Sequence, residues 1–213
     1  MLAIVGGKGG CGKTTTALGV ARALAADGRR PVVVDADCSM PNLHAMADTD
    51  LRPGLCTLAD GSPVDVALHP SRKYPELDVL PAGTATGPPD ESTLARVARA
   101  SGPVVLDCPA GATEAVTAPL RVADSALVVS TAERASLVDA AKTARMASAL
   151  DTTLAGSVLT RTRDGIPDTA ELTALRAECQ VLASVPETED VLSSRVGRAA
   201  YGRLASRLAE RNI

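Results

Sequence analysis

The stretch GGKGGCGKTTT at 6–16 has the residue types and spacing to bind phosphate. It contains GxxxxGK[ST] between four apolar residues at 2–5 and an Ala-rich helical pattern. Glycines let backbone N–H groups surround phosphate oxygens, and the following helix adds the positive end of its dipole. We expect Lys13 to reach the β- and γ-phosphates and the Thr14 hydroxyl to complete the shell of a Mg²⁺ ion. The predicted nucleotide-binding loop comprises Gly7, Lys8, Gly9, Gly10, Cys11, Gly12, Lys13, Thr14 and Thr15.

Three aspartates follow apolar runs and are candidates for metal binding or water activation. Asp35 and Asp37 end the run VVV, and two residues apart on an extended chain they project to the same side. Asp107 ends the run VVL, which is typical of a carboxylate placed near Mg²⁺ through a water. Aspartate also starts loops and caps helices, so the residues alone leave that structural role open.

We expect strands and helices to position these side chains, because apolar runs alternate with helical patterns along the chain. The expected strands are 2–5, 31–34, 77–80, 104–106, 126–129, 156–159 and 181–183. The expected helices are 13–26, 91–100, 112–119, 134–149, 168–178, 188–194 and 198–210. Continuous apolar strands are typical of parallel strands covered on both faces. The pattern predicts one α/β domain over 1–213, a doubly wound and mainly parallel sheet with helices on both faces and a surface excursion at 47–75. Ligands of such sheets bind beyond the carboxyl ends of the strands.

The composition narrows the class of protein. The chain has 213 residues, a formal net charge of −3, 46% hydrophobic residues, two Tyr and no Phe or Trp. This balance gives no global basic field for nucleic acid and no aromatics to stack bases. The cysteines are odd in number and form no CxxC pair, which favours a reducing compartment and a cytoplasmic protein. No apolar run approaches the ~18 residues of a spanning helix.

A second lysine makes the phosphate loop more specific. Lys8 and the residues after it, KGGCGKT, resemble the deviant Walker motif KGGxGK[ST] of the MinD/ParA family of P-loop ATPases. The resemblance implies binding of ATP and Mg²⁺, slow hydrolysis stimulated by dimerisation and by a partner, and an ATP-dependent homodimer. In that dimer Lys8 would reach the phosphates of the other subunit, as an arginine finger does. A solvated loop lysine is the alternative.

Two further segments resemble the switches of this family. Residues 35–43, with Asp-x-Asp followed by Asn-Leu, resemble switch I, and DCPAG at 107–111 resembles switch II. The resemblance implies that Asp37 orients the attacking water and that Asp35 supports the loop or the metal shell. It implies that the second segment responds to loss of the γ-phosphate. The implied catalytic residues are Lys8, Lys13 and Asp37, and the implied metal site is Thr14, Asp35 and Asp107.

The expected base pocket departs from the family pattern. Thr160-Arg161 stands where the family commonly has Asn-Arg, and Thr offers one hydroxyl where Asn offers a paired donor and acceptor. Side-chain selection of adenine is therefore in question, although backbone contacts could supply it. The segment 185–187 resembles the family's Ile-Pro-Glu loop, which places Pro186 beside the base.

The family resemblance leaves several cellular roles open. The leading one is a nucleotide-controlled switch that positions a division, motility or other apparatus through an unidentified protein partner or activator. A metal-cluster or cofactor-loading ATPase is the second, because Cys11, Cys38 and Cys108 lie in the phosphate loop or beside the switch aspartates. A small-molecule kinase or synthetase would need a substrate pocket that the sequence does not identify.

Two kinds of surface partner can be weighed from charge. The 18 Arg and 4 Lys are scattered along the chain, which makes DNA partitioning a weaker alternative. The C-terminal stretch AAYGRLASRLAERNI has an apolar stripe and a basic stripe. It predicts a final helix that packs on the core, with peripheral membrane contact as the alternative.

Overall fold

The computed structural model describes residues 1–26, 28–84, 87–99, 102–163, 166 and 168–211. Within these residues the chain forms one sheet of eight strands in the order β3-β4-β2-β5-β1-β6-β7-β8. All neighbouring strands are parallel except β3 and β4, which confirms the doubly wound α/β prediction. The strand bounds are β1 (Leu2–Gly6), β2 (Val32–Asp35), β3 (His69–Pro70), β4 (Asp78–Leu80), β5 (Val104–Ala110), β6 (Ser125–Thr131), β7 (Thr153–Thr162) and β8 (Val181–Pro186).

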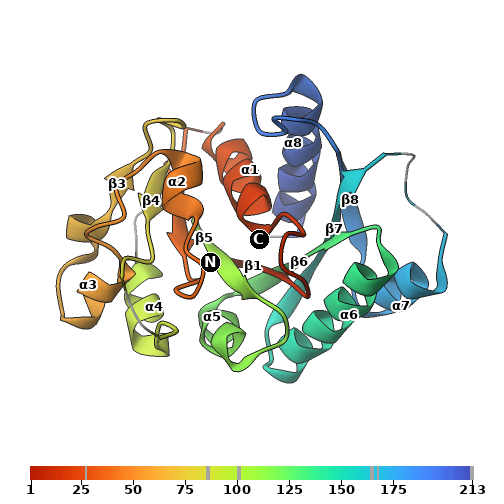
Figure 1. The fold of residues 1–213 in the computed structure, drawn as a ribbon, viewed down its shortest axis with the longest axis horizontal. Helices are drawn as coiled ribbons and strands as arrows, with labels where there is room; N and C mark the ends of the chain where they lie inside the picture. Colours follow the sequence, from red (N-terminus) through yellow and green to blue (C-terminus); the bar gives the residue numbers. More distant parts are fainter. Residues whose placement is uncertain (27, 85–86, 100–101, 164–165, 167, 212–213) are drawn as a thin grey trace.

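Helices cover both faces of the sheet. Figure 1 shows α1, α2 and α8 on one face and α4, α5, α6 and α7 on the other. The helix bounds are α1 (Lys13–Ala25), α2 (Leu43–Ala47), α3 (Leu55–Ala59), η1 (Val64–Ala67), α4 (Glu91–Val97), η2 (Glu114–Val116), α5 (Thr117–Val122), α6 (Arg134–Ala149), α7 (Ala170–Glu178) and α8 (Arg195–Ala209).

Two apolar clusters, one on each face, form the core. Along β1, Ile4 packs into the cluster beneath α1 and α8, while Val5 packs into the cluster beneath α4 to α7. Leu127 and Val128 of β6 divide in the same way. Because alternate side chains enter different clusters, both must be apolar, which explains the continuous apolar runs of the sequence.

The C-terminal helix α8 packs against α1 and the sheet. Tyr201, Leu204 and Leu208, which form the apolar stripe of the tail, are buried. The contact with α1 depends on Gly19, where a Cβ would lie 2.5 Å from a carbon of the Tyr201 ring. The apolar stripe of α8 therefore packs inside the protein. Among the described residues, no helix is both long and apolar enough to cross a bilayer.

The helix expected at 188–194 is wrong, because the structure has turns there. The backbone oxygen and a carboxylate oxygen of Asp190 accept N–H groups from Ser194 and Ser193, at 2.8 and 3.3 Å. The hydroxyl of Ser194 then accepts the N–H of Gly197 and caps α8. Side-chain bonds to nearby backbone compete with a helix and favour a turn and an N-cap.

Other boundaries also differ from those expected. The surface excursion at 47–75 contains α3, η1 and the short antiparallel strand β3, and its Leu55 and Leu58 are buried. The segment thus contributes to the core. The expected helix at 112–119 is a 3₁₀ turn followed by α5, and β5 and β7 run further than the apolar runs that predict them.

Candidate functional site

The phosphate loop connects β1 to α1 and has an open backbone. Gly10 and Gly12 have φ values of 76° and 94°, in the left-handed region that favours glycine. A Cβ at Gly9 or Gly10 would meet no atom within 4 Å, so no described part of the chain packs against the loop at these two glycines. Gly12 immediately precedes α1, whose first N–H groups and dipole point toward the same space. The loop can therefore surround an anion.

Two side chains at the start of α1 lie beside the phosphate loop. Lys13 is buried, and its Nζ donates to the backbone oxygen of Lys8 at 3.4 Å. The Thr14 hydroxyl donates to Asn42 Oδ1 at 3.0 Å, which ties the loop to the residues just before α2. A hollow of about 230 Å³ lies over these groups; its lining includes Gly9, Gly10, Gly12, Lys13, Thr14, Thr15, Asp37, Asn42, Asp107 and Arg161.

Asp107 lies on β5, in register with Ile4 of β1 and Asp35 of β2. The residue is 2% exposed, and its Oδ1 has no hydrogen-bond partner. Burial raises the pKa of the Asp107 carboxyl to about 7; the Thr14 hydroxyl lowers it and the Asp35 charge raises it. A buried oxygen without a donor, beside a phosphate loop, fits a hard cation. Mg²⁺ fits because it needs only one or two carboxylates besides phosphates and waters.

Asp35 holds the predicted switch I together. Its carboxylate accepts the N–H of Asp37 and the N–H of Leu43, both at 3.2 Å. These bonds tie the beginning of the 35–43 segment to the start of α2. Burial raises the pKa of the Asp35 carboxyl to about 7, and the two N–H donors oppose that rise. Of the two roles expected for Asp35, the geometry supports the loop-supporting one.

Asp37 projects toward the hollow over the phosphate loop. Its Oδ1 accepts the N–H groups of Ser39 and Met40, at 3.2 and 3.1 Å. Ser39 and Met40 are exposed, and Met40 is 76% exposed. The carboxylate therefore shapes an exposed turn, and Asp37 borders the hollow over the phosphate loop.

Lys8 lies outside its own phosphate hollow. Its side chain is 49% exposed, and its Nζ lies 3.2 Å from Glu133 Oε2, just before α6. The loop and α6 are in close contact, because a Cβ at Gly7 would lie 2.2 Å from the backbone carbon of Asp139. The sequence contained no signal that Glu133 is the partner of Lys8; the contact arises from the packing of β6 and α6 beside the loop.

The residues expected to form the base pocket lie in environments that differ from one another. Thr160 is 4% exposed, and its hydroxyl donates to the backbone oxygen of Cys11 at 2.6 Å. It therefore supports the phosphate loop. Arg161 has φ 52° at an irregular point of β7 and lines the hollow over the phosphate loop. Pro186 pairs with Thr162 at the end of β8.

The cysteines near the site do not converge. Cys108 belongs to the core cluster beneath α4 to α7, and Cys11 belongs to the cluster on the other face. Burial raises the pKa of the Cys11 and Cys108 thiols, and it raises that of Cys38 to about 11. In the described part of the chain no three His, Cys, Asp or Glu side chains are placed to hold a metal ion together. The geometry gives no support to a thiolate cluster.

Comparison with known proteins matches residues 2–197 to the CobQ/CobB/MinD/ParA nucleotide binding domain. The septum site-determining protein MinD of a Synechocystis strain is 29% identical to the chain over 64% of this chain and 55% of its own length. The match thus spans about half of that relative.

Solved structures give the same result for the fold. The cell division ATPase MinD of Pyrococcus furiosus superimposes with a TM-score of 0.81 at 25% identity, over 99% of this chain and 98% of its own. MinD of Pyrococcus horikoshii, solved with Mg-ADP, superimposes with a TM-score of 0.82 at 22% identity, over 99% and 96%. At 22% identity, the similarity to the Pyrococcus horikoshii protein shows a shared fold alone.

Proposed function

The chain belongs to the CobQ/CobB/MinD/ParA family of nucleotide-binding domains, and from this premise we propose that it is an MgATP-dependent dimerising ATPase that acts as a nucleotide-controlled switch. The observation that carries the proposal is the position of Lys8. The phosphate loop, Lys13, Thr14 and Asp107 are assembled within one chain, while the Lys8 amino group lies at the surface outside that site.

The residues of one chain account for nucleotide binding. Backbone N–H groups of the loop would donate hydrogen bonds to the phosphates, and the Lys13 amino group would supply a positive charge to the β- and γ-phosphates. Thr14 and Asp107 would hold Mg²⁺, which supplies positive charge to the phosphate oxygens when bound. The hydroxyl oxygen of Thr14 can bind the metal through a lone pair while its O–H still donates to Asn42, so this bond would couple the metal to the segment before α2.

Asp37 and Lys8 would complete the reaction. Asp37 borders the γ-phosphate space with one carboxylate oxygen engaged by the turn, so the other oxygen can orient a water for in-line attack. Lys8 is held by an exposed ion pair, which contributes only ~0–1 kcal/mol and can be exchanged for a phosphate of a second subunit. Dimerisation would thus supply the missing cation.

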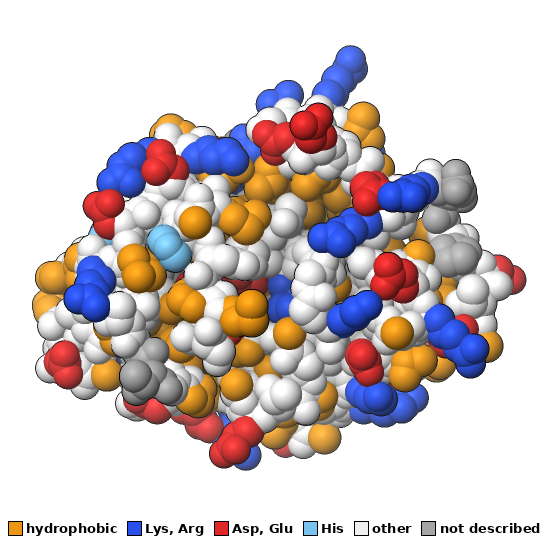
Figure 2. All heavy atoms as spheres, in the orientation of Figure 1, with side chains coloured by type: hydrophobic (Ala, Val, Ile, Leu, Met, Phe, Trp, Pro, Cys, Tyr) orange, Lys and Arg blue, Asp and Glu red, His pale blue; other side chains and the backbone are white. Residues whose placement is uncertain are grey.

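The proposed cellular role is positioning or assembly of another component through a protein partner that distinguishes the two nucleotide states. The 35–43 segment supports this role, because it connects Thr14, the proposed metal ligand, through Asn42 to the exposed Met40. On the face drawn in Figure 2, Lys and Arg side chains alternate with Asp and Glu and form no continuous basic surface. That face does not favour the DNA-partitioning alternative.

The test combines oligomeric state with hydrolysis. Asp37→Ala should form a dimer with ATP, measured by light scattering after size exclusion, and hydrolyse poorly. Lys13→Ala should remain a monomer because it loses nucleotide. Lys8→Ala should bind a fluorescent ATP analogue normally and lose turnover. Lys142→Ala, which removes another exposed lysine paired with a carboxylate, is the matched control and should hydrolyse normally.

Two results would contradict the proposal. A monomeric Asp37→Ala protein in saturating ATP would rule out the nucleotide-dependent dimer. Normal turnover of Lys8→Ala would rule out the action of this lysine in trans. Co-sedimentation of the ATP-bound Asp37→Ala protein with liposomes, and separately with DNA, would then distinguish the surface partners.

A further inference from the structure

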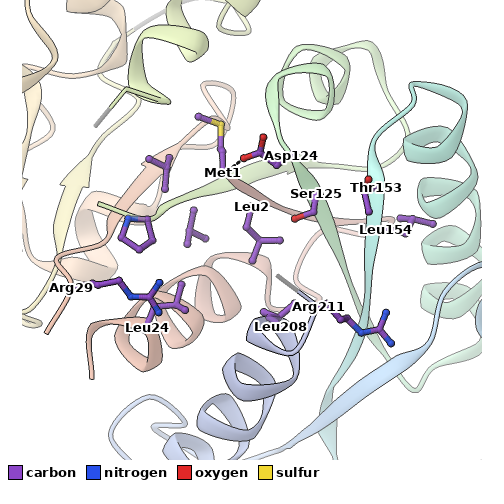
Figure 3. Close-up of a pocket in the computed structure, with 13 residues that line it drawn as sticks. Met1, Leu2, Leu24, Arg29, Asp124, Ser125, Thr153, Leu154, Leu208 and Arg211 are labelled. Carbon is purple, nitrogen blue, oxygen red and sulfur yellow. Dashed lines mark hydrogen bonds and ion pairs between the residues drawn. The ribbon is translucent and has the colours of Figure 1, made fainter. Parts of the chain in front are cut away.

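A hollow of about 710 Å³ lies at the end of the sheet opposite the phosphate loop (Figure 3). Its floor consists of the first residues of neighbouring strands. Leu2 of β1 is in register with Val105 of β5 and Ser125 of β6, and Ser125 is in register with Thr153 of β7. Because the phosphate loop follows the carboxyl end of β1, the hollow and the nucleotide site lie at opposite ends of the same strands.

The walls of the hollow are largely apolar. Leu24 of α1 and Leu208 of α8 lie on the same side of the sheet as Leu2, and Leu154 of β7 borders the hollow (Figure 3). Sites for small organic molecules have volumes of roughly 300–1,000 Å³ and mainly apolar linings with a few polar groups. The size and lining of this hollow match that description.

The floor contains a polar group that the protein leaves unsatisfied. Ser125 is 2% exposed, and its Oγ has no hydrogen-bond partner. A buried hydroxyl without a partner is costly, so few remain in a fold without a reason.

Strand geometry turns Ser125 toward the hollow. Leu127 and Val129 of β6 belong to the apolar cluster beneath α1 and α8. Alternate residues of a strand face the same side, so Ser125 also faces α1 and α8, beside Leu2 (Figure 3). Because Ser125 lines the hollow, rotation about its Cα–Cβ bond between staggered positions can bring the hydroxyl to a ligand. A hydroxyl can both donate and accept, and a ligand hydroxyl can pair with it in either sense.

The charged groups of the hollow lie at its rim and have partners within the protein. Asp124 forms an ion pair with the amino group of Met1, and the Arg211 guanidinium donates an N–H to Gln180 Oε1. Arg29 is engaged as well. The residues of the floor carry no charge. A charged ligand on this floor would lose hydration without gaining a charge of opposite sign, which favours an uncharged ligand.

We propose that this hollow binds a small uncharged molecule with an apolar body and one hydroxyl group, an alcohol or a phenol. The apolar body lies against Leu2, Leu24 and Leu208, and the ligand hydroxyl forms a hydrogen bond with Ser125. No residue of the phosphate loop lines the hollow, so binding is independent of nucleotide hydrolysis.

A ligand pair that differs by one hydroxyl tests the hydrogen bond. 2-Naphthol and naphthalene would compete with the uncharged fluorescent probe N-phenyl-1-naphthylamine near neutral pH, where phenols keep their proton. The preference for 2-naphthol, expressed as the ratio of the two dissociation constants, should be ~5-fold smaller in Ser125→Ala than in the wild type, as expected for the loss of one hydrogen bond. 2-Naphthoate, the anion of similar size, should displace the probe less well than 2-naphthol.

The matched control is Ser130→Ala. Ser130 is a buried serine near the other end of β6, and its hydroxyl contacts that of Ser136. This variant should keep the wild-type preference for 2-naphthol. Without ligand, Ser125→Ala should be at least as stable as the wild type in urea, because the hydroxyl that it removes has no partner.

Methyl NMR with labelled leucine locates the ligand. 2-Naphthol should shift the methyl signals of Leu24 and Leu208, while those of Leu94, beneath the opposite face of the sheet, should not move. Unmoved signals of Leu24 and Leu208 at the solubility limit of 2-naphthol would overturn the proposal. An unchanged preference in Ser125→Ala, or binding of 2-naphthoate as tight as that of 2-naphthol, would also overturn it.

Discussion

Replacing Asp107 with Asn is expected to stabilise the metal-free protein at alkaline pH while abolishing Mg²⁺-dependent hydrolysis. Burial raises the pKa of the Asp107 carboxyl from its usual 3.8 to about 7. Above that pH the native chain contains a buried carboxylate, one oxygen of which has no donor. Asparagine has nearly the same shape and no charge, so the substitution removes the cost of ionising this buried group.

The magnitude follows from the linkage between pKa and stability. A folded pKa of about 7 against 3.8 in the unfolded chain corresponds to ~4 kcal/mol of lost stability above both values. Part of the rise in pKa comes from the Asp35 charge, and the Asn amide gains no new partner. We therefore expect Asp107→Asn to be more stable than the wild type by ~2 kcal/mol above both pKa values. The folded state binds more protons between the two pKa values, so native stability falls as pH rises through that window. The advantage of Asn should therefore vanish toward the acid end.

Urea unfolding with a chelator present, at about pH 4, about pH 6 and about pH 8, would measure this difference. Asp65→Asn, at an exposed carboxylate of η1, is the control and should change little at any pH. Addition of Mg²⁺ to the ADP-bound protein should stabilise the wild type more than Asp107→Asn. A variant less stable than the wild type at about pH 8, or an advantage independent of pH, would refute the assignment of a buried, uncompensated carboxylate.

Three further predictions concern packing, the phosphate loop and the metal. Gly19→Ala should lower the free energy of unfolding by ~1–3 kcal/mol in a urea titration, because the new Cβ would overlap the Tyr201 ring. Gly202→Ala in α8, where a Cβ meets nothing within 4 Å, is the control and should be neutral or stabilising. Thr160→Val should weaken nucleotide binding ~5-fold, because the Thr160 hydroxyl holds the Cys11 carbonyl of the phosphate loop. The ratio of ATP to GTP affinities, measured by fluorescence competition, should stay unchanged. A changed ratio would show that Thr160 contacts the base. Mg²⁺ affinity, titrated in the presence of ADP, should rise with pH up to about 7, because Asp107 must lose its proton to bind the metal; a pH-independent affinity would argue against Asp107 as a ligand.

Much of the fold could be predicted from the sequence because its signals are local. Parallel strands covered on both faces must be apolar throughout, so each of the expected strands is present in the sheet. The antiparallel strand β3 has two residues and no apolar run, so it gave no signal. The helix expected at 188–194 failed because hydrogen bonds around Asp190 and the Ser194 cap favour turns before α8.

The candidate site was predictable to the extent that its residues follow strands. The loop glycines, Lys13 and Asp107 lie where strand ends meet at one edge of the sheet, as the pattern indicates. The particular hydrogen bonds were not predictable. Asp35 turns its carboxylate into the switch I backbone, and Thr160 supports the loop from a strand far along the chain.

By itself the sequence determined that this protein has a phosphate-binding loop at the end of a buried parallel strand, because glycine spacing and apolar runs act through the backbone over a few residues. Only the tertiary structure decided that Lys8 pairs with Glu133, that Asp107 has a buried oxygen without a donor, and that Thr160 donates to the backbone oxygen of Cys11. These contacts join segments distant in the chain. They arise from strand order and helix packing, which place side chains together without any local pattern that records the pairing.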